Sequence, residues 1–341
     1  MKAVRFHQHG GPDVLRYEDA PDPEPGPGEA LVRVRACALN HLDLWERRGL
    51  EHVTIPLPHI SGSDVAGEVV ASPATDVPAG RRVMLQPGLS CGRCEACLSG
   101  RDNECPQYEV LGYGRHPGGY AELVKVPAQN LVPIPDEIGF AEAASFPLTF
   151  VTAWHMLVTR ARVRRGDDVL VLAAGSGVGQ AAVQIAVLHG ARVFATAGSD
   201  AKLEKARSLG ASEVIHHHLQ DIAGEIRRLT NRRGVDVVIE HVGDATWTKS
   251  IRSLARGGRL VTCGATTGYQ GSIDLRALFS KQLSIYGSYM GTKGELLHAA
   301  QFFFGGQLKP IIDGSYPLAE AAAAQQRLEE SGQFGKLVLN V

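Results

Sequence analysis

The stretch DDVLVLAAGSGVGQAAVQIAVL, residues 167–188, decides the fold. Residues 169–173 are continuously apolar, which is typical of a strand buried on both faces of a parallel sheet. Glycines follow at positions 175, 177 and 179, and apolar residues then recur at helical spacing. A strand, a glycine turn and a helix in this order aim backbone N–H groups and a positive helix end at a pyrophosphate.

The match to the pattern G-x-G-x-x-G is imperfect, because Ala174 and Ser176 occupy its first and third positions. A purely structural turn is the alternative interpretation. The next segment favours a nucleotide site, since residues 191–197 read as a second strand and residues 202–211 as a second helix. The predicted phosphate-binding residues are Gly175, Ser176, Gly177, Val178 and Gly179.

The composition narrows the range of partners. The chain has 341 residues, of which 44% are hydrophobic and 21% charged, and its formal net charge is −1. This balance is ordinary for a globular protein and gives no reason to expect nucleic acid or an anionic membrane as partner. The sequence shows no secretory signal and no apolar run that would span a bilayer. We therefore expect a cytoplasmic protein that acts on a small-molecule substrate.

The pattern of predicted strands divides the chain into two domains. Short strands are predicted at residues 2–6, 30–37, 66–71, 82–85 and 121–126. From residue 140 onward, strands alternate with helical stretches, which is typical of a doubly wound parallel sheet. We expect an α/β protein with a β-rich domain at residues 1–126 and 293–341, which the last strand rejoins, and a dinucleotide-binding domain at residues 127–292.

Four of the six cysteines stand as C-x2-C-x2-C-x7-C at Cys91, Cys94, Cys97 and Cys105. Thiolates at this spacing can converge on one tetrahedral ion, and Zn²⁺ favours four sulfurs in closed, structural sites. Disulfides are one alternative, although thiols stay reduced in the cytosol, and an iron–sulfur cluster is another. A site with four sulfur ligands has no open position, so the predicted metal holds a loop and does no chemistry.

Together these features resemble the medium-chain dehydrogenase/reductase superfamily, which contains zinc alcohol dehydrogenases and zinc-free quinone oxidoreductases. The resemblance covers essentially the whole chain and implies a GroES-like catalytic domain joined to a Rossmann domain. It is carried by the cysteine loop, RACALNHLDLWERRG (residues 35–49), PHISGSDVAGEV (58–69), FPLTFVTAWHML (146–157) and AAGSGVGQAAVQIA (173–186).

The departures from the zinc alcohol dehydrogenases determine the expected reaction. Those enzymes hold a second, catalytic zinc with residues that match Asn40, Ser63 and Leu148 here, and none of these three is a thiolate or imidazole ligand. The hydroxyl that relays a proton in those enzymes matches Leu42. A replacement site built from His41, His59 and Asp64 is conceivable. However, the resemblance places His41 toward the cofactor phosphates, and His59 has a simpler structural reading.

The resemblance therefore favours the quinone oxidoreductase and enoyl reductase branch, in which NAD(P)H delivers hydride to a conjugated acceptor. Such an acceptor spreads the incoming charge, so the protein mainly supplies orientation and hydrogen-bond donors. The candidate catalytic residues are Asn40, Trp45 and Asp64. Asn40 is expected to donate to the developing oxyanion or to position the nicotinamide, with a turn residue as the alternative. Trp45 is expected to shape an apolar wall, and the proton comes from water.

The end of the second predicted strand indicates the cofactor. NAD-binding folds usually carry an acid there for the ribose 2′-OH, and this chain has Ala197, Gly198 and Ser199. Small residues leave room for a 2′-phosphate, with which Lys202 could pair, so we favour NADP(H) over NAD(H). Lys202 on a solvated helix face is the alternative. The further candidate cofactor-binding residues are His41, Thr152, Ser199, His217, Val242, Gly264 and Lys336.

Two other functions stay open at this stage: a zinc-dependent alcohol dehydrogenase with a divergent metal site, and a non-enzymatic cofactor-binding protein. The apolar segment LSIYGSY, residues 283–289, reads as an edge strand. Exposed edges need covering, and pairing with a second copy across a two-fold axis would do this. We therefore expect a homodimer or homotetramer, with internal capping of the edge as the alternative.

Overall fold

The computed structural model describes residues 1–51 and 53–341, which form two compact units. The first unit comprises Met1–Leu148 and Thr292–Val341, and the second comprises Thr149–Gly291. The first unit thus extends to residue 148, whereas the sequence analysis placed the boundary at residue 126. The reason is that β9 (Leu131–Pro133) pairs with β5 (Arg82–Leu85) inside the first unit, where α3 (Phe140–Ala144) also packs.

The second unit is built on a six-stranded sheet in the order β12-β11-β10-β13-β14-β15, in which every neighbouring pair is parallel. Its strands are β10 (Asp168–Val171), β11 (Arg192–Ala197), β12 (Glu213–His216), β13 (Val235–Glu240), β14 (Leu254–Thr262) and β15 (Ser284–Gly287). Numbered along the chain this is the order 3-2-1-4-5-6 of a dinucleotide-binding sheet. The predicted doubly wound fold is confirmed.

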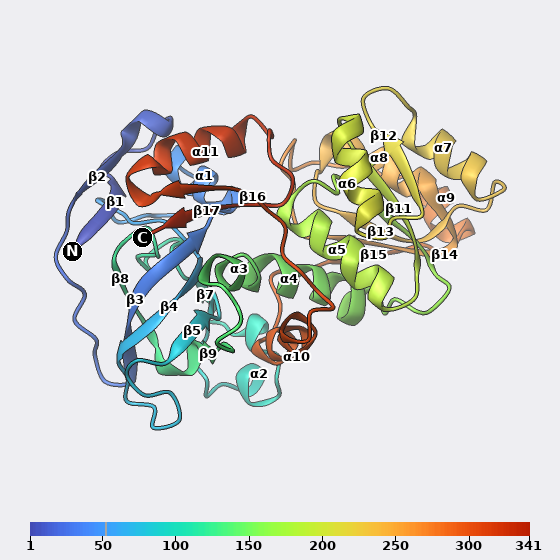
Figure 1. The fold of residues 1–341 in the computed structure, drawn as a ribbon. Helices are drawn as coiled ribbons and strands as arrows, with labels where there is room; N and C mark the ends of the chain where they lie inside the picture. Colours follow the sequence, from blue (N-terminus) through green and yellow to red (C-terminus); the bar gives the residue numbers. More distant parts are fainter. Residues whose placement is uncertain (52) are drawn as a thin grey trace. The chain divides into compact units, whose positions relative to one another are not determined.

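Helices cover both faces of this sheet, with α5 and α6 on one face and α7 and α8 on the other (Figure 1). The helices are α5 (Gly177–Leu188), α6 (Asp200–Ser208), α7 (Ile222–Leu229), α8 (Asp244–Ser253) and α9 (Leu275–Ser280). Before them, α4 (Pro147–Trp154) continues into the π-helical turn His155–Arg160. Leu170, Phe194, Ile215 and Leu260 are completely buried in the core. Burial on both faces of the sheet explains the continuously apolar sequence at residues 169–173.

The first unit contains a seven-stranded, mainly antiparallel sheet in the order β16-β17-β3-β4-β5-β9, with β8 also paired to β3. Its remaining strands are β3 (Glu29–Ala38), β4 (Asp64–Ala71), β8 (Leu123–Pro127), β16 (Ile312–Pro317) and β17 (Lys336–Asn340). Two small sheets pair β1 (Lys2–Phe6) with β2 (Leu15–Asp19) and β6 (Gly88–Leu89) with β7 (Glu109–Val110). The helices are α1 (His41–Arg48), α2 (Glu95–Leu98), α10 (Lys293–Phe304) and α11 (Ala321–Glu329), beside short 3₁₀ turns at Pro12–Val14, Asp102–Glu104, Ala128–Asn130 and Leu318–Glu320.

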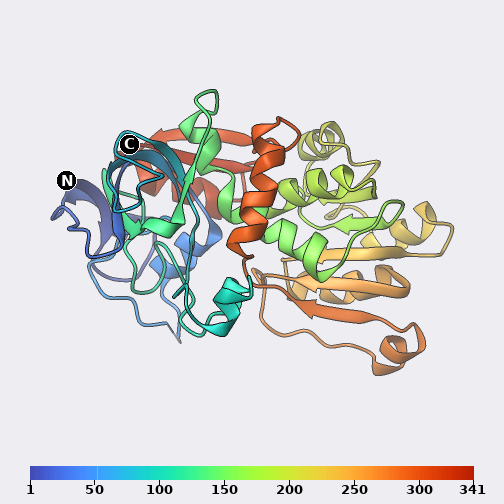
Figure 2. The ribbon, with the colours of Figure 1, turned by 90° about the horizontal axis from the view of Figure 1, so that it is seen from below.

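Strand β17 returns to the sheet of the first unit, as predicted. It pairs antiparallel with β3, with Val338 opposite Ala38, so the red C-terminal strand lies against the blue strand β3 (Figures 1 and 2). This pairing brings the first residue of β17, Lys336, close to the segment that opens α1. Among the described helices, none combines the length and the apolar character needed to traverse a bilayer.

Candidate functional site

The glycine turn after β10 forms a tight strand-to-helix connection. Ser176 caps α5, and its Oγ accepts the backbone N–H of Gly179 at 2.9 Å. A Cβ on Gly179 would lie 2.2 Å from the backbone oxygen of Ala173, so only glycine lets the helix approach the strand this closely. The first N–H groups of α5, including those of Gly177 and Val178, have no partner within the helix itself. The turn therefore has the geometry of an anion-binding helix start.

The loops that follow β13 and β14 reach the same edge of the sheet, because parallel strands end together. The buried carboxylate of Glu240 accepts the backbone N–H groups of Val242 at 2.7 Å and Gly243 at 3.1 Å. The Gly264 backbone lies against His241. Cys263 beside it is no nucleophile, since burial raises the pKa of its thiol to about 12. The Glu240 carboxylate thus orients the backbone at Val242 and Gly243, a contact that sequence reasoning missed.

The end of β11 carries cationic groups and no acid. Gly198 is covered by the imidazoles of His217 and His218, which a Cβ at residue 198 would meet at 2.9 and 2.8 Å. Ser199 caps α6 by accepting the N–H of Lys202 at 3.4 Å. Burial lowers the pKa of His217 to about 4, with further lowering from His218, His216, Lys202 and Lys249. The positive neighbours that disfavour a charged His217 would attract an anion.

Thr152 contributes a buried hydroxyl to the second unit. Its side chain is 5% exposed, and within the described chain its Oγ1 has no hydrogen-bond partner. A buried polar atom of this kind normally finds a partner, and here a ligand can supply it. Together with the glycine turn and the cationic end of β11, this orphaned hydroxyl fits a nicotinamide dinucleotide.

In the first unit, three predicted site residues meet in one buried cluster. The Lys336 Nζ donates to Asn40 Oδ1 at 2.7 Å and to Asp64 Oδ2 at 2.9 Å. The Asn40 Nδ2 donates to the same Asp64 oxygen at 3.0 Å. The other Asp64 oxygen accepts the backbone N–H of Leu148 at 2.8 Å. Lys336 was predicted to face the cofactor, and its contact with Asn40 and Asp64 went unforeseen.

The cluster lies where the resemblance places a catalytic zinc. Asn40 and Leu148 stand at two of the ligand positions, and Asp64 connects them. Ser63, at the third position, is completely buried and its hydroxyl has no partner among the described residues. Leu42, at the position of the relay hydroxyl, offers no polar atom. An amide, a hydroxyl and a hydrocarbon are a poor donor set for Zn²⁺.

The alternative ligands His41, His59 and Asp64 do not converge. His59 Nε2 lies 2.9 Å from Glu46 Oε1, and Ser61 Oγ donates to the same carboxylate at 3.0 Å. Asp64 is held by Lys336 instead. Burial raises the pKa of Glu46, which the nearby His59 and Ser61 partly offset. His59 is thus a buried residue held by Glu46, which agrees with the structural role predicted for it.

A second buried carboxylate adjoins the cluster. Asp43 Oδ2 accepts the backbone N–H of Asn40 at 2.8 Å and the hydroxyl of Tyr120 at 2.9 Å. Burial raises the pKa of Asp43 to about 7. Sequence reasoning missed both Asp43 and Tyr120. The acid three residues after a helix-opening Asn was a usable signal, because that spacing lets a side chain reach back to the helix start.

His41 and Trp45 lie one turn apart on α1. Both are half-buried, and their ring centroids are 6.5 Å apart. Trp45 therefore presents part of its ring outward, as a pocket wall would require. Its predicted role, and that of His41 toward the cofactor phosphates, stay predictions.

The four cysteines of the predicted metal loop are free thiols whose sulfur atoms all lie within 4.8 Å of one another. Cys94 Sγ is 3.5 Å and Cys91 Sγ 3.9 Å from Cys97 Sγ. Sulfurs 2.3 Å from a tetrahedral zinc ion lie about 3.8 Å apart, whereas disulfide sulfurs lie about 2.05 Å apart. Backbone N–H groups of Arg93 and Cys94 lower the pKa of Cys91 to about 6. The geometry fits a structural zinc ion.

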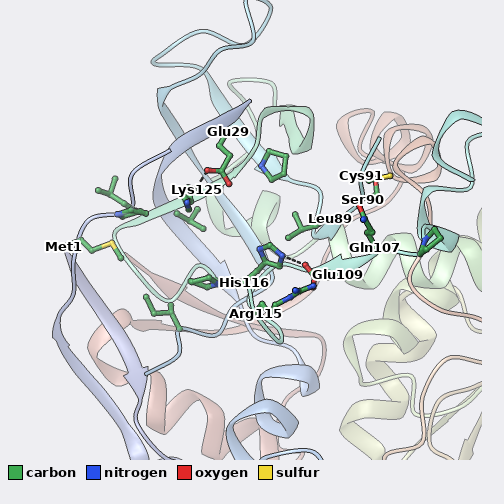
Figure 3. A pocket seen from close by; sticks show the side chains of 18 residues that line it. Met1, Glu29, Leu89, Ser90, Cys91, Gln107, Glu109, Arg115, His116 and Lys125 are labelled. Carbon is green, nitrogen blue, oxygen red and sulfur yellow. Dashed lines mark hydrogen bonds and ion pairs between the residues drawn. The ribbon is translucent and has the colours of Figure 1, made fainter. Parts of the chain in front are cut away.

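A cavity of about 450 Å³ opens beside this loop in the first unit (Figure 3). Its wall includes Cys91 and Leu89, and its charged groups face one another, as with His116 against Glu109. Asn40, Asp64 and Lys336 do not line it. This cavity is therefore separate from the buried cluster.

Comparison with known proteins identifies the class. Residues 26–136 match the family described as Alcohol dehydrogenase GroES-like domain, and residues 177–304 match Zinc-binding dehydrogenase. The chain belongs to the medium-chain dehydrogenase/reductase superfamily and is an oxidoreductase.

Individual relatives cover the whole chain. A quinone oxidoreductase from Pseudomonas aeruginosa is 33% identical over an alignment of 350 positions that covers 99% of both chains. A crotonyl-CoA reductase from Streptomyces collinus is 32% identical and covers 95% of this chain and 80% of its own. The solved structure of an NAD-dependent alcohol dehydrogenase is 49% identical, covers 100% of both chains and superposes with a TM-score of 0.96.

The cysteine loop generates the first prediction. The purified protein is expected to carry one zinc per chain, and Cys94→Ser is expected to lose it and to lower Tm, because the metal cross-links the loop. Metal analysis by mass spectrometry and thermal melting measure both effects. The control is Cys263→Ser, which should keep the zinc. Iron in place of zinc, or disulfides without metal, would contradict the assignment.

Proposed function

We propose that this protein is an NADPH-dependent reductase of conjugated acceptors, either quinones or α,β-unsaturated carbonyl compounds, that works without a catalytic metal. The observation that carries the proposal is the buried cluster. At the ligand positions of a catalytic zinc, this chain places an amide, a hydroxyl and a hydrocarbon. Asn40 and the backbone of Leu148 contact the Lys336–Asp64 ion pair.

The reaction then depends on the acceptor. Bound NADPH supplies the hydride. Hydride addition to the β-carbon moves an electron pair onto the carbonyl oxygen, and conjugation makes this possible without a Lewis acid. Asn40 is the candidate donor to that oxygen, since its amide sits at the start of α1. A proton from water then completes the product. The names of the Pseudomonas and Streptomyces relatives support acceptors of this kind.

A zinc-dependent alcohol dehydrogenase with a divergent site is the second candidate. The 49% identity to a solved NAD-dependent alcohol dehydrogenase favours it. The donor set favours the first candidate, because an unactivated ketone needs a strong electrophile at its oxygen. The two candidates differ in metal content, with one zinc per chain in the first and two in the second.

The substrate class can be tested with a panel. NADPH oxidation is expected with 1,4-benzoquinone and with a simple enone, at a kcat/KM roughly a hundredfold above that for the matched saturated ketone. The difference follows from delocalisation of the incoming charge. Absorbance at 340 nm reports turnover, with metal content measured on the same sample. Alcohol oxidation by a protein that holds two zinc ions per chain would instead establish the second candidate.

We further propose that NADP(H) is preferred over NAD(H). The end of β11 offers Gly198 and Ser199 where NAD-binding folds carry an acid, and Asp200 beyond them is exposed. The half-buried Lys202 lies near His217, in a cationic setting that suits a 2′-phosphate.

Lys202→Ala tests this preference. The Kd of NADPH is expected to rise about tenfold while that of NADH stays unchanged, because only NADPH carries the 2′-phosphate. Isothermal titration calorimetry measures both. Lys205→Ala, on the exposed side of the same helix, is the matched control. Equal weakening of both cofactors would assign Lys202 a different role.

We also propose a homodimer or homotetramer in the cytoplasm, where the free cysteines would stay reduced. Strand β15 ends the second unit's sheet, and Tyr289 just beyond it is 58% exposed. A second copy would cover this edge.

Tyr289→Asp is accordingly expected to raise the dimer dissociation constant at least about tenfold, because it adds a charge where the second copy would pack. Light scattering after size exclusion reports the mass. Tyr269→Asp alters a tyrosine that is 86% exposed in the loop between β14 and α9, and serves as control. A wild-type mass of one chain would refute the dimer.

A further inference from the structure

The side chain of Asn40 is held between two opposite charges. Asn40 precedes α1, Asp64 opens β4 and Lys336 opens β17, so three separate segments supply the contact. All three residues are buried, with 7%, 0% and 2% of their surface exposed. The Asn40 oxygen faces the ammonium at 2.7 Å, and its nitrogen faces the carboxylate at 3.0 Å.

These two charges permit one orientation of the amide. An ammonium only donates hydrogen bonds and a carboxylate only accepts them. Rotating the Asn40 amide by half a turn would set its N–H groups against Lys336 and its oxygen against Asp64, so both contacts would become repulsive. An isolated asparagine has no such preference. The ion pair therefore fixes which end of the amide points in which direction.

In that orientation, one N–H of Asn40 is weakly held. The first N–H of Nδ2 is engaged by Asp64. Among the described residues, the second has only the backbone oxygen of Ala38 as a partner, at 3.4 Å, which is near the outer limit of a hydrogen bond. Donation from Lys336 to the amide oxygen also polarises the group and strengthens its N–H donors.

We propose that Lys336 and Asp64 are positioning residues, which orient the Asn40 amide so that its weakly held N–H can serve the developing oxyanion. The inference rests on the proposed function. Stability gives a weaker account of the pair, because a buried ion pair contributes little more to stability than well-packed apolar side chains of similar volume. A fixed donor direction is what apolar side chains cannot supply.

A double-mutant cycle tests whether Lys336 acts through Asn40. Asn40→Ala is expected to lower kcat for enone reduction about a hundredfold, and Lys336→Met about tenfold or more. Combining them should lower kcat no further than Asn40→Ala alone, because an orienting residue has no effect once the oriented group is gone. The Kd of NADPH is measured for each variant and is expected to stay unchanged.

A second variant separates orientation from folding. Lys336→Met alone leaves the Asp64 charge buried without its partner and is expected to lower Tm. In the double variant Lys336→Met/Asp64→Asn the site is neutral, so Tm should recover while kcat stays low. Lys125→Met removes a partly exposed lysine that pairs with Glu29 and is the matched control.

Amide NMR gives a readout that does not need turnover. In protein labelled with ¹⁵N, the side-chain protons of Asn40 should exchange slowly with solvent, and Lys336→Met/Asp64→Asn should speed that exchange.

Three results would overturn the inference. These are multiplicative effects in the cycle, full kcat in the neutral double variant, or a raised NADPH Kd with unchanged kcat, which would make Lys336 a cofactor ligand. Failure of the wild-type protein to reduce any conjugated acceptor would instead refute the proposed function, and the NMR comparison would still decide the orientation.

Discussion

The buried ion pair between Lys336 and Asp64 is the interaction that holds the candidate catalytic residues Asn40 and Asp64 of the first unit together. It connects the start of β17, the start of β4 and, through Asn40 and Leu148, the segments that open α1 and α4. Removing one charge would leave the other buried without its partner, which is far more costly than replacing both. The pair thus joins these segments electrostatically.

The second unit is organised differently at the edge where its parallel strands end. Its cofactor edge is set by backbone geometry, since Gly179 lets α5 approach β10 and the Glu240 carboxylate holds the N–H groups that follow β13. The proposed cofactor would therefore meet mainly backbone N–H groups at this edge, whereas the cluster in the first unit is built from buried polar side chains.

Features set by neighbours in sequence could be predicted, and those set by distant residues could not. The strand, glycine turn and helix at residues 167–188 and the cysteine spacing are local patterns, and the structure agrees with both. Asn40, Asp64 and Lys336 were each identified, but the contact between Asn40 and Lys336 spans 296 positions. The boundary was missed because α3 reads as the first helix of the Rossmann domain, although it packs on the other sheet.

The return of β17 to the sheet of β3 has a consequence for biosynthesis. The second unit is one continuous segment, from Thr149 to Gly291, so all strands of its sheet have been translated before β17 is made. The first unit begins earlier, yet its central strand β3 lacks one neighbour until β17 has been translated. The nucleotide-binding half can therefore fold before the catalytic half is complete, and the unpaired side of β3 needs protection from other strands during that delay.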